Sequence, residues 1–225
     1  MTITALFFDF DGLILDTETP ELRAWEEIYR RYGLTFPLHE WSEVVGGWGE
    51  STFDPAAYLL RHLRNGLSRD ALVEFQREVS RTLLEKESPR PGVQDLLEEA
   101  YNKAVRCFVV SSSSRLWVEG HLKRLELWGY FESVICADDV LAGYIEPHPH
   151  LYLKALEVSA LHPLQVLALE DSPNGVRAAR TAGLRVVAIP NPVTERFHFP
   201  VSPDARLDSL QGIKLQSLIA IGESA

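Results

Sequence analysis

Short apolar runs alternate with helical patterns along most of this chain. Five runs are typical of buried strands, because each is brief, apolar and bounded by turn or polar residues. They lie at residues 4–8, 105–110, 134–136, 166–169 and 185–189. Helical spacing of apolar residues occupies most of the intervals. This alternation predicts an α/β fold with a parallel sheet and right-handed crossovers.

The interval between the first two predicted strands is much longer than one crossover helix requires, and it has helical periodicity of its own. We therefore expect an inserted helical domain. Its first helix is predicted to begin at Thr19 as N-cap, with Pro20 at the first helical position, and to end near Gly33. Further helices are expected to begin at Asp54-Pro55 and near Ser68.

The sequence Ser88-Pro89-Arg90-Pro91-Gly92 interrupts the helical pattern and marks the return to the main domain. We therefore predict an α/β core domain at residues 1–16 and 88–225. A helical cap domain is predicted at residues 17–87.

Composition excludes several classes of partner. The 225 residues carry a net charge of -10 without a block of Lys or Arg, so neither nucleic acid nor an anionic membrane is an expected partner. Cys107 and Cys136 lie in apolar runs and are expected to be reduced core residues. The start, Met1-Thr2-Ile3-Thr4, lacks a basic segment, and no apolar window is long enough to span a membrane. We expect a cytoplasmic protein, monomeric or a small homo-oligomer.

Two carboxylates lie two positions apart where the first strand gives way to glycine, in Phe8-Asp9-Phe10-Asp11-Gly12. Ligands of open α/β sheets bind at the carboxyl ends of strands. Two anions this close repel unless a cation or a proton lies between them. The spacing suggests a magnesium site or an acid and base pair. Acidic residues that merely cap a strand at a solvated turn are the alternative for this motif alone.

Polar groups also follow two later strands. Ser111 to Ser114 come directly after the second strand, where hydroxyls and N–H groups at a helix start can hold phosphate. The alternative is that one serine only caps the helix. Glu170 and Asp171 follow the strand at 166–169, just before Ser172-Pro173, which predicts a helix start. If these strands are neighbours, ligands for a hard cation and donors for phosphate meet in one crevice.

Four blocks in this order resemble a known family. They are Phe8-Asp9-Phe10-Asp11-Gly12 with Asp16-Thr17-Glu18, Pro91-Gly92-Val93, Val110-Ser111-Ser112-Ser113, and Glu170-Asp171-Ser172-Pro173-Asn174-Gly175 with Ala178-Ala179 and Ala182-Gly183. The chain is similar over nearly its whole length to haloacid dehalogenase superfamily hydrolases with a helical cap, close to beta-phosphoglucomutase-like and phosphoglycolate-phosphatase-like proteins. The resemblance implies a Rossmann-like parallel core, and a magnesium-dependent phosphatase acting on a small phosphorylated metabolite.

The resemblance also implies residue roles. Asp9 is the expected nucleophile that forms an aspartyl-phosphate, and Asp11 is the expected general acid and base. The expected Mg²⁺ ligands are Asp9, Asp171, the main-chain carbonyl of Asp11, and Glu170 directly or through water. The expected phosphate-binding residues are Ser111, Ser112 and Ser113.

One position departs from the family. Members carry a lysine before Pro-x-Pro, whereas this chain has Glu146-Pro147-His148-Pro149. That lysine pairs with the nucleophile and the phosphate, and a desolvated anion there would repel both, at a cost on the order of several kcal/mol. Lys154, Lys123 and His148 are candidate replacements, none of them favoured. A weakly active phosphoester-binding protein is therefore one alternative function.

A sugar phosphomutase of the beta-phosphoglucomutase type is the other alternative. Such members carry a histidine soon after the Asp-Thr pair and an arginine in the cap loop, but this chain has Glu18-Thr19-Pro20-Glu21 and Val45-Gly46-Gly47-Trp48-Gly49-Glu50. The missing cations favour simple hydrolysis. Trp48 is a candidate substrate contact or a packed loop aromatic. Arg115 is a candidate substrate contact or an ordinary surface arginine.

Overall fold

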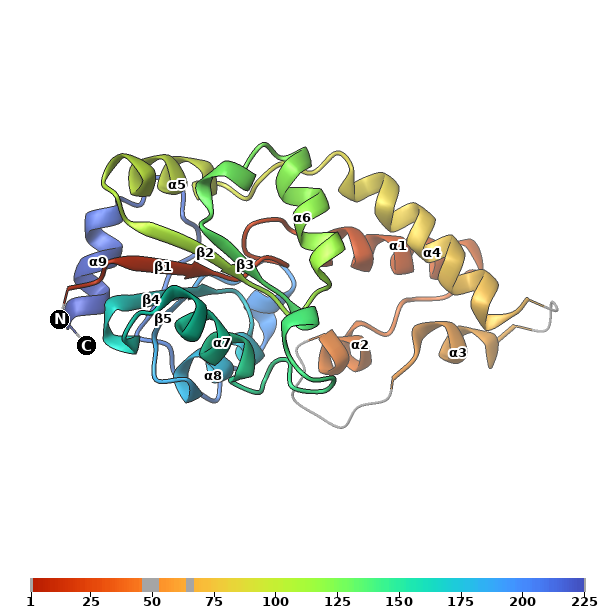
Figure 1. Cartoon of the computed structure of the whole chain (residues 1–225). Helices are drawn as coiled ribbons and strands as arrows, with labels where there is room; N and C mark the ends of the chain where they lie inside the picture. Colours follow the sequence, from red (N-terminus) through yellow and green to blue (C-terminus); the bar gives the residue numbers. More distant parts are fainter. Residues whose placement is uncertain (1, 46–52, 64–66, 225) are drawn as a thin grey trace. The chain divides into compact units, whose positions relative to one another are not determined.

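The computed structural model describes residues 2–45, 53–63 and 67–224 (Figure 1). The chain forms two compact units. The first, called the core unit here, comprises Met1–Leu15 and Ser88–Ala225. The second, the helical unit, comprises Asp16–Glu87.

The core unit is built on a parallel sheet with the strand order β3-β2-β1-β4-β5-β6. Its strands are β1 (Ala5–Phe8), β2 (Arg106–Val110), β3 (Ser133–Ile135), β4 (Val166–Glu170), β5 (Arg185–Ala188) and β6 (Ala205–Arg206). The five predicted strands are confirmed, as is the parallel α/β architecture. The two residues of β6 are too few to produce a recognisable apolar pattern. Because β1 pairs with both β2 and β4, the carboxyl ends of these three strands are neighbours.

Helices cover both faces of this sheet (Figure 1). They are α5 (Val93–Asn102), α6 (Arg115–Arg124), α7 (His150–Ser159), α8 (Pro173–Thr181) and α9 (Leu215–Ser224). The face that carries Phe7 and Phe108 packs against α7 and α8, and these two rings meet edge to face at 5.2 Å. Burying a side chain of this size stabilises the fold by about 1.5–3 kcal/mol. Cys107 and Cys136 are free and buried, as predicted.

The predicted start of α8 is confirmed. Pro173 is its first residue, and the N-cap Ser172 accepts a hydrogen bond of 3.0 Å from the Gly175 N–H. This cap satisfies one of the free N–H groups of the first turn. It fixes the backbone directly after Glu170 and Asp171.

The helical unit contains α1 (Glu18–Arg31), α2 (Leu38–Val45), α3 (Pro55–Leu60) and α4 (Arg69–Leu84). Asp54 and Ser68 cap α3 and α4 through the N–H groups of Ala57 and Ala71, at 3.0 Å and 3.1 Å, so both predicted helix starts are confirmed. The helix α2 was not predicted.

The predicted N-cap of α1 is wrong. The helix begins at Glu18, with Thr17 at the N-cap position. The Thr19 N–H donates to Asp16 Oδ1 at 2.9 Å, so the side chain of Asp16 holds this end of the helix instead. An earlier acceptor therefore displaced the start by two residues.

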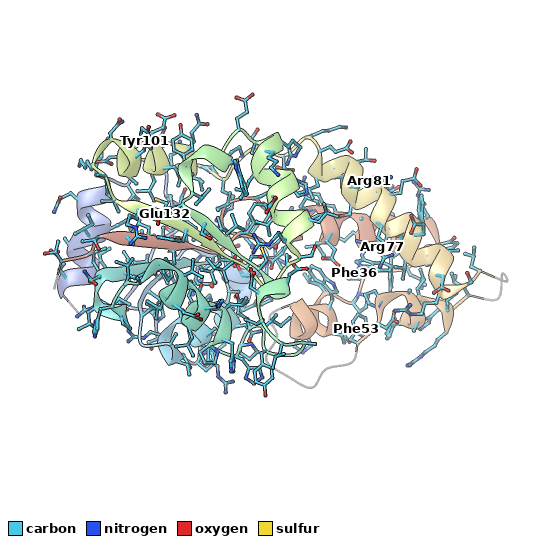
Figure 2. The ribbon with its side chains drawn as sticks, viewed as in Figure 1. Phe36, Phe53, Arg77, Arg81, Tyr101 and Glu132 are labelled. Atoms are coloured by element: carbon cyan, nitrogen blue, oxygen red, sulfur yellow. The ribbon has the colours of Figure 1, made fainter. Side chains whose placement is uncertain are left out.

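Aromatic packing holds the helical unit together. Phe36 is buried and meets the rings of Tyr29 and Trp41 at 5.1 Å and 5.7 Å. Phe36 lies inside this unit, whereas Arg77 and Arg81 are exposed side chains of α4 (Figure 2). No helix in the described parts of the chain is both long and apolar enough to cross a membrane.

Candidate active site

The predicted polar groups lie at the adjacent ends of β1, β2 and β4. The Asp9 N–H continues the β1–β4 ladder by donating to Leu169 O at 3.0 Å. Across β2, Ser111 Oγ lies 3.4 Å from Asp11 Oδ2. Residues about 100 positions apart in the sequence are thus brought together by the strand order alone, as the sequence analysis expected.

Three buried carboxylates form a cluster. Asp9, Glu170 and Asp171 are 5%, 0% and 1% exposed, and one oxygen from each lies within 4.8 Å of the others. Glu170 Oε2 is buried and has no hydrogen-bond partner among the described residues. Three ionised carboxylates are costly to bury unless a cation or protons compensate them. An all-oxygen set with an unsatisfied oxygen fits a hard divalent cation such as Mg²⁺.

Burial and mutual repulsion shift the titration of this cluster. Burial, followed by the charges of Glu170, Glu146, Asp171 and Asp11, raises the pKa of Asp9 well above its usual value. Burial raises the pKa of Asp171 to about 7. A bound cation would favour the ionised forms, so cation binding and proton release are linked in this cluster.

Asp171 is held from two sides. Its Oδ2 accepts hydrogen bonds from Asn191 Nδ2 at 2.7 Å and Thr194 Oγ1 at 3.1 Å. Gly12 lies against the same carboxylate with a φ of +83°, and a β carbon at that position would collide with Asp171. Gly12 is therefore required both by its backbone conformation and by this close approach. Sequence reasoning missed Asn191 and Thr194, which follow β5.

Arg90 supplies a positive charge to this region. Its guanidinium donates to Ile189 O at 2.9 Å, to Pro190 O at 2.8 Å and to Gly12 O. The charge of Arg90 opposes the effect of burial on the pKa of Asp171. From the sequence, Arg90 was predicted only to be part of the break between the two domains. The only feature of the sequence that could have pointed to a role for Arg90 in the site is its position between two prolines.

Glu170 is also anchored. The buried Tyr152 hydroxyl on α7 donates to Glu170 Oε1. Gly175, in the first turn of α8, leaves no room for a β carbon beside the same carboxylate. The family block therefore has a packing reason for its glycine, and Tyr152 is a further residue that the sequence analysis did not identify.

The loop at residues 111–114, called the serine loop here, holds Asp11. Ser113 Oγ donates to Asp11 Oδ2 at 2.6 Å, and the Ser113 N–H donates to Ser111 Oγ at 3.1 Å. Trp117 on α6 donates from Nε1 to Asp11 Oδ1 at 2.9 Å. Both Asp11 oxygens therefore have donors. Ser112 faces another partner, since its Oγ accepts from the Glu146 N–H at 3.3 Å.

Glu146 adds a further anion to the site. Its Oε1 is buried and has no hydrogen-bond partner among the described residues. Burial, and to a smaller extent the charge of Asp11, raises the pKa of Glu146 to about 7, against the opposing effect of a hydrogen bond with Ser112. The same carboxyl group raises the pKa of Asp9 and of Glu170. Glu146 is therefore a further carboxyl group whose charge acts on the cluster of Asp9, Glu170 and Asp171.

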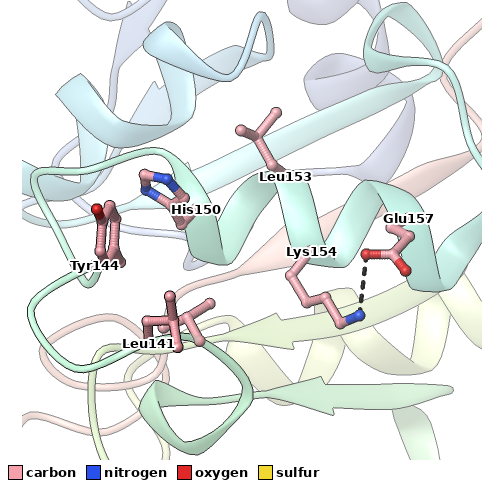
Figure 3. Close-up of a pocket in the computed structure, with 7 residues that line it drawn as sticks. Leu141, Tyr144, His150, Leu153, Lys154 and Glu157 are labelled. Atoms are coloured by element: carbon pink, nitrogen blue, oxygen red, sulfur yellow. Dashed lines mark hydrogen bonds and ion pairs between the residues drawn. The ribbon is translucent and has the colours of Figure 1, made fainter.

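The candidate replacements for the lysine have other partners. Lys154 pairs with Glu157 at 3.0 Å, and Lys123 pairs with Glu119 at 3.0 Å. Lys154 lies along a hollow of about 450 Å³ on α7, which Leu141, Tyr144 and Leu153 also line (Figure 3). The ring of His148 lies 5.9 Å from that of Tyr144.

The two candidate substrate contacts remain predictions. Arg115 is engaged with acidic side chains of the core unit, at 2.6 Å from Asp139 and 3.4 Å from Glu119. Trp48, with the rest of the loop at 46–50, lies outside the described residues.

Comparison with known proteins places the chain in a family. The model of the haloacid dehalogenase-like hydrolases matches residues 6–189. YhcW of Bacillus subtilis is 40% identical over 217 residues, which cover 96% of each chain. The phosphorylated carbohydrates phosphatase of Thermotoga maritima is 30% identical over 185 residues, which cover 80% of this chain and 82% of that protein.

The fold agrees with this result. The crystal structure of CbbY from Rhodobacter sphaeroides in complex with phosphate superposes with a TM-score of 0.71 at 29% identity, covering 96% of this chain and 99% of that one. Because the family model spans most of the sequence, the chain belongs to the haloacid dehalogenase-like hydrolases and is a phosphatase-type enzyme of that family.

Proposed function

We propose that this enzyme hydrolyses a small phosphorylated metabolite with Mg²⁺ and through an aspartyl-phosphate on Asp9. The observation that carries the proposal is the convergence of Asp9, Glu170 and Asp171, with oxygens within 4.8 Å of one another, beside Asp11 and its serine loop. This arrangement joins a carboxylate nucleophile, oxygen ligands for a cation and phosphate donors in one site.

Asp9, Asp171 and the main-chain carbonyl of Asp11 would hold the Mg²⁺, with Glu170 as a direct or water-mediated ligand. When bound, the ion neutralises charge on the phosphoryl group and orients it. Asn191 and Thr194 fix Asp171 for this task, because both donate to its Oδ2. Tyr152 fixes Glu170 in the same way.

Asp9 would act as the nucleophile. One of its carboxylate oxygens attacks phosphorus, the bond from phosphorus to the leaving oxygen breaks, and the leaving oxygen takes the electron pair. Asp11 gives that oxygen a proton and later removes one from the water that hydrolyses the aspartyl-phosphate. Ser111 and the N–H groups of Ser112 and Ser113 would hold the transferred phosphoryl oxygens.

The relatives narrow the proposed substrate class. The Thermotoga maritima protein is named for phosphorylated carbohydrates, and the CbbY structure contains phosphate. We therefore propose a phosphorylated carbohydrate as the metabolite. The helical unit, proposed as a cap over residues 17–87, would supply specificity.

Hydrolysis is favoured over the two alternatives. Residues 18–21 carry no cation to hold a second phosphate, and phosphatases are among the named relatives, so a mutase is not favoured. Glu146 is the residue that favours a weakly active phosphoester-binding protein, because its buried Oε1, which has no hydrogen-bond partner in the described part of the chain, belongs to a carboxyl group whose charge acts on Asp9.

Hydrolysis of p-nitrophenyl phosphate by the whole chain tests the proposal. We expect turnover with Mg²⁺, none with EDTA, and background rates for Asp9→Asn. Asp95→Asn, an exposed carboxylate on α5, is the matched control and should keep full activity. Equal, background-level rates in wild type and Asp9→Asn would leave only the phosphoester-binding function.

A further inference from the structure

Trp117 is a residue on α6 to which the catalytic scheme above gives no role. Its indole Nε1 donates a hydrogen bond of 2.9 Å to Asp11 Oδ1. The other oxygen of Asp11 faces hydroxyl groups, Ser113 Oγ at 2.6 Å and Ser111 Oγ at 3.4 Å. The two oxygens of the proposed acid and base thus have chemically different partners.

The indole is held by aromatic packing. The ring of His121, one helical turn further along α6, lies 4.4 Å from that of Trp117. His121 in turn stacks on Phe10 at 6.2 Å and accepts from Arg124 Nε through its Nδ1 at 3.2 Å. Phe10 is fully buried. The donor is therefore fixed by a helix and a core aromatic residue, which preserves its direction toward Asp11.

The two kinds of partner allow different proton chemistry. An indole N–H can only donate, whereas a serine hydroxyl can donate or accept. The oxygen that faces Trp117 is therefore restricted to accepting a hydrogen bond. The oxygen that faces Ser113 can carry a proton, because the hydroxyl can rotate and become the acceptor.

We propose that Trp117 is a positioning residue for Asp11, which keeps Oδ1 as a fixed acceptor and so assigns proton transfer to Oδ2. This inference rests on the proposed function. In the first half-reaction Asp9 bonds to phosphorus, the leaving oxygen takes the electron pair of the broken bond, and the proton on Asp11 Oδ2 passes to that oxygen. In the second half-reaction water attacks phosphorus, the bond between phosphorus and the Asp9 oxygen breaks with its electron pair left on Asp9, and a proton of the water returns to Oδ2.

Leaving-group dependence tests the proposal. The substitution Trp117→Phe removes the N–H donor and keeps an aromatic ring against His121. The control is Trp128→Phe, since Trp128 is 39% exposed and Trp117 is 38% exposed, and Lys123 lies 4.8 Å from the ring of Trp128. Both variants are compared with wild type by kcat/KM on p-nitrophenyl phosphate and on an alkyl phosphate such as glycerol 2-phosphate.

We expect Trp117→Phe to lower kcat/KM for the alkyl phosphate about tenfold more than for p-nitrophenyl phosphate, because only the poor leaving group needs a well-placed proton. Hydrolysis of the aspartyl-phosphate does not contribute to kcat/KM, because that step follows the departure of the leaving group. The comparison of the two substrates therefore reports only on the first half-reaction. Trp128→Phe should leave both values unchanged. Equal losses on the two substrates, or no loss on either, would overturn the role of Trp117.

A measurement without turnover checks the contact itself. In a proton–nitrogen NMR spectrum, the indole signal that disappears in Trp117→Phe belongs to Trp117. We expect Asp11→Ala to shift that signal and Asp95→Asn to leave it in place. An unmoved signal in Asp11→Ala would contradict the hydrogen bond. Failure of wild type to hydrolyse either phosphate would instead reject the proposed function, whereas wild-type turnover with equal losses in Trp117→Phe would reject only the positioning role.

Discussion

The backbone of Gly12 runs so close to the carboxylate of Asp171 that no β carbon fits between them. These residues are 159 positions apart in the sequence, and the β1–β4 pairing brings them together. Gly12, which ends the motif at residues 8–12, therefore also determines where the carboxylate of Asp171 can lie.

Gly12→Ala should lower the affinity for Mg²⁺ in addition to lowering the stability of the fold. The φ of +83° imposes strain on any L residue, and the methyl group would also displace Asp171. Gly143→Ala is the matched control, since Gly143 has a φ of +85° and no atom of the described residues lies within 4 Å of the position of its β carbon. We expect both variants to lose about 1–2 kcal/mol of stability from strain. Only Gly12→Ala should lose Mg²⁺ affinity, as measured by calorimetric titration, and equal affinities would contradict this.

Replacing Glu146 should raise turnover. Glu146→Lys removes an anion that repels Asp9 and places a cation beside the phosphoryl site. We expect a gain in kcat/KM on p-nitrophenyl phosphate of about tenfold, which corresponds to about 1.4 kcal/mol of barrier. Glu146→Gln, which only removes the charge, should lie between wild type and Glu146→Lys. Unchanged or lower kcat/KM in Glu146→Lys would count against this interpretation of the site.

Magnesium should stabilise the fold through Asp171. A ligand present at 100 times its dissociation constant adds about 2.7 kcal/mol to the free energy of unfolding. Asp171→Asn should abolish that increment, and without metal it should be more stable than wild type because it removes one of the repelling charges. Thermal unfolding with Mg²⁺ and with EDTA measures both effects. Asp95→Asn should retain the full increment, and a retained increment in Asp171→Asn would show that the ion binds elsewhere.

The stability of the metal-free protein should fall as pH rises. Asp171 has a folded pKa of about 7, against an ordinary value of 3.8, and that of Asp9 is raised as well. A carboxyl group with a raised pKa binds more protons in the folded state than in the unfolded state. The free energy of unfolding therefore decreases between about pH 4 and pH 7, by at most about 1.4 kcal/mol per pH unit for each group.

Urea unfolding in EDTA at pH 5 and at pH 7 measures this slope. Saturating Mg²⁺ should reduce it, because the bound ion favours the ionised carboxylates in the folded protein. Metal-free stability that increased with pH across this window would show that the cluster does not titrate in this way.

The strands and the approximate meeting of the motifs were predictable from the sequence. Apolar runs such as 166–169 identify buried strands, and the carboxyl-end rule predicts where Asp9 and Asp171 meet. The helix starts at Ser68 and Ser172 were also predictable, because a serine before the helical pattern supplies the missing acceptor. At the start of α1, Asp16 and Thr19 competed for that role, and the pattern did not reveal which acceptor is used.

Residues that act through tertiary contacts were not predictable. Arg90, Asn191 and Tyr152 hold the site from three different segments, and each has an ordinary structural interpretation within its own segment. Trp117 likewise has an ordinary interpretation from the sequence, as one aromatic residue of a helix. Only the folded structure, in which the ends of neighbouring strands lie side by side, shows that these side chains face the acidic residues.

The chain leaves the core unit and returns to it at positions that lie next to each other. Leu15 and Pro89 form an isolated antiparallel bridge, and the Arg90 N–H donates to Ile14 O at 2.8 Å, so the segment that leaves the core unit and the segment that returns are joined side by side. These contacts therefore close the core unit at the point where residues 16–87 are inserted. Because both contacts are made within the core unit, that unit itself holds together the two points at which residues 16–87 leave and rejoin it.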